Sequence, residues 1–427
     1  MHLNRAIAPA IAELTTELSI FPEIKVLPNG ARLHISKNQV QPIVRVEFVF
    51  KAGKWYQPKA GIASLTAKML KEGTLQYSAK QIADLAEYYG ASLDVSHGFD
   101  RASVTLYCLS KFLPTLLPLV FDVIINPSFP EKEFELVKQR VIQTLSVDKQ
   151  KNSYLATEAF TTALYGKNHP YANYISEEDI VIINIDEVKQ FHKISYNLAS
   201  SEIFITGDTS EEAIQTIEDY ISAFTQEKNK AQQYIVASPS SETIIEEKTS
   251  NVMQASLRIG KESISPLHSN YPALYLLNHT LGGYFGSRLM RNIREDKGYT
   301  YGIYSSLSHK EKGSAFIVGT DIKGDKIAET LDEISKEIQA LRIEQISEEE
   351  LATVKKHLEG KFLSDHSTIF DKMDRYRSNI LLDLPAEFYT QLLERIHTLS
   401  PIELQEAASR YLQEETLFQV VIGGSKA

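Results

Sequence analysis

The sequence has little cysteine and no surplus of positive charge. Its single cysteine, Cys108, excludes an intrachain disulfide and a cysteine-rich metal site, and its place in the apolar alternation ASVTLYCL predicts a core position. Lys and Arg number 45 against 55 Asp and Glu, so the net charge is −10, and no basic run occurs. Because nucleic-acid surfaces need clustered cations, no nucleic-acid partner is expected.

Long apolar runs are also missing. No window reaches the roughly 18 apolar residues that a membrane-spanning helix needs, so no membrane partner is expected. The first stretch, MHLNRAIAPAIAELTTELSI, carries Glu13 and Glu17 where a signal or transit peptide would avoid acids. These features predict a cytoplasmic protein.

The length favours more than one domain. The chain has 427 residues, and single hydrophobic cores stop growing at about 250 to 300 residues. Hydrophobic residues make up 43% and charged residues 23%, as in ordinary globular proteins. Residues 226–247 are polar and rich in Ser, Gln and Lys. We therefore predict an N-terminal domain over residues 1–225, a linker over 226–247 and a C-terminal domain over 248–427.

Strand and helix patterns alternate along the first half. Apolar alternation predicts strands, and Ser78 as a cap with Gly90 as a terminator predicts the bounds of one helix. Pro130 suits the first turn of a later helix, whose positive N-terminal end Glu131 and Glu133 favour. The expected strands are 29–36, 42–50, 92–96, 101–109 and 202–208, and the expected helical regions are 60–71, 79–89, 111–164 and a short helix ending near 224.

The second half resembles the first. Residues 130–148 align with 347–365 at an offset of 217, and residues 85–96 align with 293–304 at an offset of 208, matching Gly90 with Gly298. Glutamates at helix starts are common, so chance matches are the alternative. The order of helix, strand and helix agrees in both halves. The predicted fold class is α+β, with two similar domains in tandem, each a mostly antiparallel sheet backed by helices.

The segment 61–74, GIASLTAKMLKEGT, has the frame of a zinc-peptidase helix without its ligands. In H-x-x-E-H, two His four residues apart share one helix face and a Glu beside them serves as general base. The frame around residues 53–74 resembles the pitrilysin/insulinase family of zinc metallopeptidases, whose pattern is G-x-A-H-F-L-E-H-M-x-F-K-G-T. The matching residues are Gly61, Ala63, Met69, Gly73 and Thr74.

The resemblance assigns the ligand positions to residues that cannot bind zinc. Ser64 and Lys68 stand where the family has its two His, and Ala67 stands where it has the Glu base. The family's third ligand, a Glu further along, falls on Thr144 or Leu145. An ammonium at Lys68 in place of the metal is one interpretation, and a solvated lysine is the other.

The eleven histidines are scattered and show no ligand spacing. Four of them have no partner motif nearby and are expected to be ordinary core or surface residues: His97, His169, His192 and His279. We therefore expect no metal in this chain.

The second half keeps a different motif. Residues 281–306, LGGYFGSRLMRNIREDKGYTYGIYSS, resemble the family pattern G-G-x-F-x-S-R-L-x-x-x-[IL]-R-E-x-x-G-L-x-Y. In that family an Arg and a Tyr seven residues apart contact the peptide and the tetrahedral intermediate, and Arg294 and Tyr301 occupy those positions here. The alternatives are an ion pair of Arg294 with Glu295 or Asp296, and sheet packing of Tyr301.

Two further residues of this motif carry expectations. Tyr299 and Tyr301 are expected on one half-buried face of the strand that follows Gly298. Arg288 is a weaker site candidate, and a structural role is expected for it.

The resemblance implies a shared active site. In heterodimeric members one subunit carries zinc and its partner carries the Arg and Tyr, so this chain is expected to be the zinc-less, substrate-binding subunit. It would form half of a clam-like chamber that encloses peptides, with zinc held by a homologous H-x-x-E-H subunit. The alternative is a structural or scaffolding member of the family with no peptidase role. LGGYFGSRL lacks the long glycine-rich loop of the mitochondrial non-catalytic processing subunit, so presequence recognition is not expected.

Overall fold

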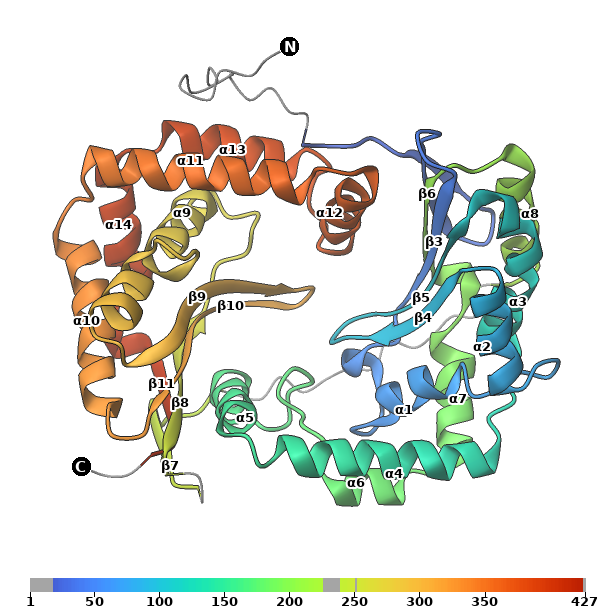
Figure 1. The fold of residues 1–427 in the computed structure, drawn as a ribbon, viewed down its shortest axis with the longest axis horizontal. Coiled ribbons are helices and arrows are strands. Elements are labelled where there is room, and N and C mark those ends of the chain that lie inside the picture. The colour runs from blue at the N-terminus through green and yellow to red at the C-terminus, as the bar shows by residue number, and fades with distance from the viewer. Residues whose placement is uncertain (1–17, 226–238, 250–251, 425–427) are drawn as a thin grey trace, which may run out of the picture.

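The first half of the chain forms a six-stranded sheet with helices around it (Figure 1). The computed structural model describes residues 18–225, 239–249 and 252–424. The strands of this sheet are β1 (Glu23–Val26), β2 (Arg32–Lys37), β3 (Ile43–Phe50), β4 (Ser92–His97), β5 (Ala102–Leu109) and β6 (Glu202–Gly207). The helices are α1 (Ile62–Met69), α2 (Ala79–Tyr88), α3 (Leu113–Ile125), α4 (Glu131–Asp148), α5 (Asn152–Tyr165), α6 (Glu177–Ile182), α7 (Ile185–Ser195) and α8 (Glu211–Ser222).

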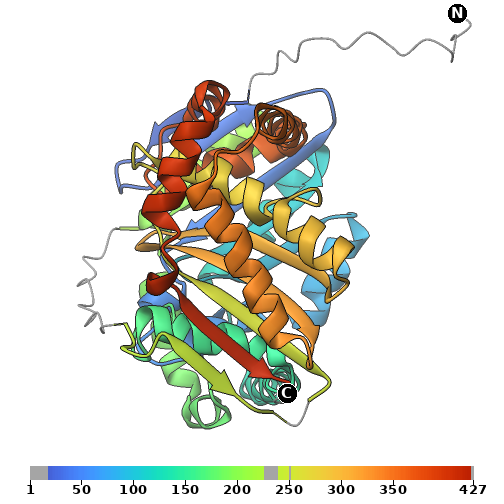
Figure 2. The same cartoon turned by 90° about the vertical axis from the view of Figure 1, so that its left-hand side faces the viewer.

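The second half forms a five-stranded sheet, which Figure 2 shows behind its covering helices. Its strands are β7 (Ile244–Glu247), β8 (Gln254–Glu262), β9 (Thr300–Lys310), β10 (Gly313–Lys323) and β11 (Phe418–Gly423). Its helices are α9 (Tyr271–Gly282), α10 (Ile327–Ile343), α11 (Glu348–Asp365), α12 (Ile369–Leu381), α13 (Phe388–Thr398) and α14 (Pro401–Tyr411), with a π-helix over Met290–Asp296.

The two sheets share one topology. Their orders are β1-β2-β6-β3-β5-β4 and β7-β11-β8-β10-β9, so every strand after β1 has a counterpart. Pairing is antiparallel except for the equivalent pairs β2–β6 and β7–β11. The predicted fold class of two similar α+β halves in tandem is confirmed.

The matched segments of the repeat have matching structure. Helices α4 and α11 both have 18 residues and begin 217 residues apart. Gly90 and Gly298 both adopt left-handed φ angles, 59° and 66°. A residue with a side chain is disfavoured there, which explains why both halves end a helix with glycine.

Apolar alternation places the first core on one face of the first sheet. Val44, Val46 and Phe48 of β3 are fully buried against the helices of their own half. Cys108 on β5 lies in the same core, as its sequence pattern predicts, and burial raises its thiol pKa to about 12.

Each half also contributes one helix to the sheet of the other half. Helix α5 packs on β8 and β11, where Phe160 and Leu164 join Val420 and Ile422. Helix α12 packs on β6, where Met373 joins Phe204. Figure 1 shows both exchanged helices between the two sheets.

The strand boundaries bear on the predicted linker. Residues 226–238 lie outside the described part of the chain, whereas β7 falls within 226–247 and pairs with β11 in the second sheet. The second sheet therefore takes residues that precede 248, and the domain bounds remain a prediction.

Two strand ends meet between the halves. The turn after β4 contacts the hairpin that joins β9 to β10: Arg101 pairs with Glu311, and the backbone N–H of Glu311 donates to Asp100 over 3.2 Å. Tyr171 donates to the same Asp100 carboxylate over 2.6 Å. These contacts fix the relative position of the two edge strands, β4 and β9.

Candidate functional site

The frame residues of 61–74 build helix α1. Gly61 precedes the helix with φ of 96°, and the Gln57 side-chain oxygen accepts from the backbone N–H groups of Gly61 and Ala63 at 3.2 and 3.3 Å. Ala63 and Met69 are fully buried. Of the matching motif residues, Gly61 thus precedes the helix, and Ala63 and Met69 hold it in the core.

The residues at the four zinc-site positions, three for ligands and one for the general base, do not fit a zinc ion. Ser64 and Ala67 are buried, with 7% and 2% of their surface exposed, and neither carries an imidazole or a carboxylate. Thr144 lies exposed on α4, which packs against α1, and its hydroxyl donates to the Arg140 carbonyl over 2.9 Å. Within residues 18–225, 239–249 and 252–424, no group of three or more His, Cys, Asp or Glu could hold a metal.

Positively charged side chains lie near the positions where the family has its zinc ligands. Lys68 is exposed on α1, in agreement with the solvated alternative. Burial, followed by the charges of Lys54 and Lys68, lowers the pKa of His97 to about 4, so the His97 ring is neutral at pH 7. His97 is therefore a neutral group beside two ammonium groups.

His169, His192 and His279 have hydrogen-bond partners within the protein. His169 accepts from the Tyr171 backbone N–H over 3.1 Å, and His192 bonds to the Ile124 carbonyl over 2.8 Å. His279 bonds to His357 over 2.9 Å, which joins α9 to α11. These contacts give each ring a packing role.

The glycines of 281–306 permit close backbone approach. A side chain at Gly282 would come within 2.4 Å of the Ser305 backbone nitrogen, and one at Gly283 within 2.6 Å of the His279 Cα. The helix that follows is a π-helix, a form that is rare and frequent at functional sites.

Arg294 lies on this π-helix and is only loosely paired. Its guanidinium carbon stands 4.6 Å from the centre of the Phe285 ring, and its Nη1 is 4.0 Å from a Glu295 carboxylate oxygen. Phe285 is 61% exposed. Phe285 occupies the Phe position of G-G-x-F, but the motif alone does not predict its contact with Arg294.

Tyr301 projects from the edge strand β9. Its side chain is 99% exposed, and within the described residues it makes no side-chain hydrogen bond or ring contact, with Arg294 or otherwise. The expected shared face with Tyr299 is wrong: Tyr299 precedes β9 and packs against the second core, because the strand starts only at Thr300.

Arg288 differs from Arg294 in being firmly held. Its Nε and Nη2 donate to the two carboxylate oxygens of Glu350, both over 2.9 Å. This bidentate pair joins the start of the motif to α11, the arrangement that a structural role requires.

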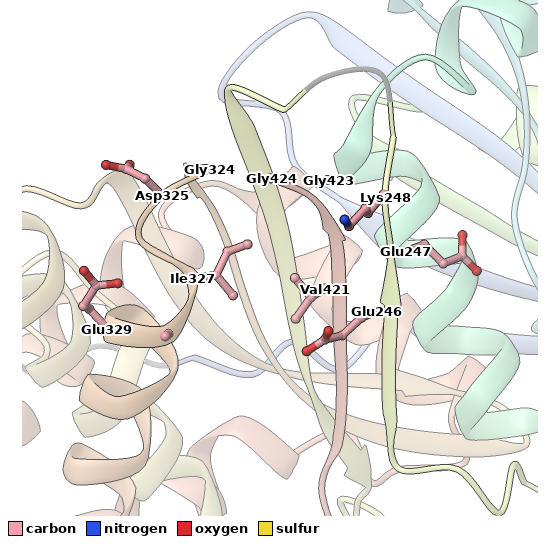
Figure 3. Close-up of a pocket in the computed structure, with 11 residues that line it drawn as sticks. Glu246, Glu247, Lys248, Gly324, Asp325, Ile327, Glu329, Val421, Gly423 and Gly424 are labelled. Atoms are coloured by element: carbon pink, nitrogen blue, oxygen red, sulfur yellow. The ribbon is translucent and has the colours of Figure 1, made fainter. Parts of the chain in front are cut away.

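Neither motif lines the pocket drawn in Figure 3. That pocket has a volume of about 430 Å³ and lies where β7 and β11 approach the start of α10. Ile327 and Val421 provide its apolar part, and Glu246, Asp325 and Glu329 are among its acidic residues. It offers neither metal ligands in suitable geometry nor the Arg/Tyr pair.

The fold and the site thus define a class: a tandem α+β protein with a zinc-helix frame that lacks its ligands and an exposed Arg/Tyr motif. Residues 32–177 match the insulinase (peptidase family M16) sequence model, and residues 183–358 match the peptidase M16 inactive domain. The chain belongs to the M16 insulinase family.

Relatives and solved structures agree with this assignment. The chain is 24% identical to the "Non-peptidase homolog YmxG" of Helicobacter pylori, covering 91% of each chain. A peptidase M16 inactive domain from Pseudomonas fluorescens is 25% identical, with a TM-score of 0.86 over 96% of this chain and 99% of that one. The periplasmic protease PqqL of Escherichia coli is 14% identical with a TM-score of 0.77, and 99% of this chain covers 49% of PqqL. The fold is therefore that of one half of a clam-like M16 protein.

No helix within residues 18–225, 239–249 and 252–424 has the length and apolar character to cross a membrane.

Proposed function

We propose that this chain is the zinc-less, substrate-binding subunit of a heterodimeric M16 metallopeptidase. It supplies Arg294 and Tyr301 to an active site whose zinc is held by a homologous H-x-x-E-H subunit, and the complex cleaves peptides or unstructured proteins. A cytoplasmic location, and no role in binding nucleic acid or membranes, belong to the same proposal.

The observation that carries the proposal is the state of the Arg/Tyr pair. The Tyr301 side chain is 99% exposed on an edge strand, so it is not packed against the described residues of its own chain. Arg294 keeps a third of its side chain exposed, and the oxygen nearest to it in an ion pair is 4.0 Å away. An exposed phenol and a loosely paired guanidinium can donate to a peptide carbonyl or a developing oxyanion.

The test is reconstitution with the zinc-motif homologue of the same genome. We expect no zinc and no peptidase activity from the chain alone, and both from the co-expressed complex. In that complex Arg294→Ala and Tyr301→Phe should each lower kcat by about 10²- to 10³-fold, the usual loss when a transition-state donor is removed.

An exposed arginine and an exposed tyrosine elsewhere in the chain provide matched controls. Arg291→Ala removes an exposed arginine three residues earlier, and Tyr88→Phe removes the hydroxyl of a tyrosine that is 81% exposed on α2. Both should leave kcat unchanged. Cleavage by the purified chain alone, or full activity of the Arg294→Ala complex, would contradict the proposal.

A second candidate is a structural or scaffolding role with no part in proteolysis. The non-peptidase name of the Helicobacter pylori relative favours it. This alternative requires that Tyr301→Phe have no effect in any complex that the chain forms, so the same reconstitution separates the two candidates.

A further inference from the structure

A polar pocket lies between the first sheet and the exchanged helix α12. Its volume is about 540 Å³. The charged residues in its wall are Arg45 and Glu47 of β3, Arg101 of the turn before β5, and Asp374 and Arg377 of α12. The pocket is thus built by both halves of the chain, on the face of the sheet opposite the first core.

Two ion pairs hold the pocket wall together. Arg45 contacts both carboxylate oxygens of Asp374, at 2.8 and 3.2 Å, and Arg377 pairs with Glu47. Glu47 is buried, with 4% of its surface exposed. These pairs connect β3 to α12 and hold the guanidinium groups of Arg45 and Arg377, while Glu311 holds that of Arg101.

Each guanidinium retains N–H donors. The Nε of Arg45 is buried and has no hydrogen-bond partner within the described residues. The Nη2 of Arg377 is 3.8 Å from Asp374, which is too long for a hydrogen bond. Arg101 uses its Nε and Nη2 on Glu311, and its Nη1 makes no hydrogen bond within the described residues.

The unused donors of the wall favour an anion. Each guanidinium group already has a carboxylate partner, Asp374 for Arg45, Glu47 for Arg377 and Glu311 for Arg101, so the attraction for an anion comes from the remaining N–H groups. His97 also lines the pocket and is neutral at pH 7, because burial and two nearby lysines lower its pKa to about 4. A buried arginine with an unused donor lowers its free energy by binding an oxyanion.

The size and the hydroxyl groups favour a peptide over a bare ion. A volume of about 540 Å³ is in the range of organic ligand sites. Ser96, Ser103 and Thr105 line the pocket, offering groups that both donate and accept hydrogen bonds. In taking a peptide as the ligand, the inference rests on the proposed function.

We propose that this pocket binds an acidic side chain of a peptide, Asp or Glu, through Arg45, Arg101 and Arg377. Peptides with a carboxylate at the matching position are then selected over neutral ones. The zinc-less chain contributes substrate selection in addition to the Arg/Tyr pair.

The experiment measures peptide binding to the full chain alone by fluorescence anisotropy. Two unstructured peptides of equal length are compared, one with Asp and Glu residues and one with Asn and Gln at the same positions. The acidic peptide should bind about tenfold more tightly, and the difference should shrink with added salt.

Two substitutions locate the binding site. Thr105→Glu adds a carboxylate to the pocket wall without removing an ion pair, and it should abolish the preference for the acidic peptide, whereas Thr105→Gln should keep it. Arg45→Gln should reduce the preference, and Arg410→Gln, at an exposed position on α14, should not. Thermal unfolding of each variant establishes that it is folded.

Several outcomes would overturn the inference. These are equal affinity for the two peptides, a preference that survives Thr105→Glu in a folded variant, or inorganic phosphate displacing the acidic peptide at the peptide's own affinity. Because the assay uses the chain without a zinc subunit, its failure is distinct from inactivity of the reconstituted complex, which tests the proposed function.

Discussion

At the scale of the residue, His192 has a structural role in the first half of the chain. It lies on α7 between the rings of Phe129 and Tyr196, and it bonds to the Ile124 carbonyl over 2.8 Å. Burial lowers its pKa to about 4, against about 6.5 in an unfolded chain. The folded protein therefore needs the ring neutral.

This difference predicts a pH dependence of stability. Between pH 6.5 and 4 the unfolded chain binds the proton and the folded chain does not, so the free energy of unfolding falls as the pH drops through that window. The contribution is complete above about pH 6.5 and amounts to at most about 3 kcal/mol. Urea unfolding at a series of pH values measures it.

The matched variant is His192→Gln, which keeps an N–H donor and does not titrate. Its stability deficit relative to the parent should be largest near pH 7 and should shrink toward pH 4. A deficit that stays constant across this window would mean that His192 is not held neutral by the fold.

At the scale of the element, the start of helix α1 requires glycine at position 61, so replacing Gly61 should lower the stability of the protein. A Cβ at Gly61 would lie 2.8 Å from the Ile180 side chain and 3.2 Å from that of Ile183, at a φ of 96°. Gly61→Ala should therefore destabilise the protein by about 1 to 3 kcal/mol, measured by chemical denaturation.

Two other glycines serve as controls, because their replacement should change the stability of the protein by smaller or opposite amounts. Gly90 has open space around it, so Gly90→Ala should carry only the cost of a left-handed φ, about 1 kcal/mol. Gly360 lies inside α11 with open space, so Gly360→Ala should stabilise by about 0.5 to 1 kcal/mol. Equal stability of Gly61→Ala and its parent would show that the frame is not needed as scaffold.

Local sequence signals predicted most of the elements of the first half. Ser78 does cap α2, with a reciprocal contact to Gln81, and Gly90 does follow its end. Pro130 is a partial success, because it precedes α4 as the cap residue instead of lying in its first turn. Tyr299 was misplaced because alternation along GYTYG does not reveal which residue begins the strand.

The sequence predicts the candidate site only where the type of residue alone decides whether zinc can bind. The empty positions Ser64, Ala67 and Lys68 follow from the sequence, since no folding can give them zinc ligands. The charged pocket does not follow from it. Arg45 and Asp374 are separated by 329 residues, and only tertiary packing brings them to 2.8 Å.

At the scale of the molecule, the exchange of α5 and α12 was not visible in the sequence. The apolar face of α5 indicates burial, but Phe160 and Leu164 do not specify which sheet they cover. In the structure they pack with Val420 and Ile422 of the other half. The two halves are thus joined through their cores as well as by the turn contacts around Arg101 and Glu311.

This exchange predicts that the two halves unfold together. Removing either half exposes an apolar face of the other, so neither half should melt separately, and calorimetry should show one transition whose calorimetric and van't Hoff enthalpies agree. Leu164→Ala should cost about 2 to 5 kcal/mol and lower the single midpoint without splitting it. Leu75→Ala, at a loop residue that is 76% exposed, should change stability by less than about 0.5 kcal/mol. Two separate transitions in the parent, or a second transition created by Leu164→Ala, would show that the exchanged helices do not couple the halves.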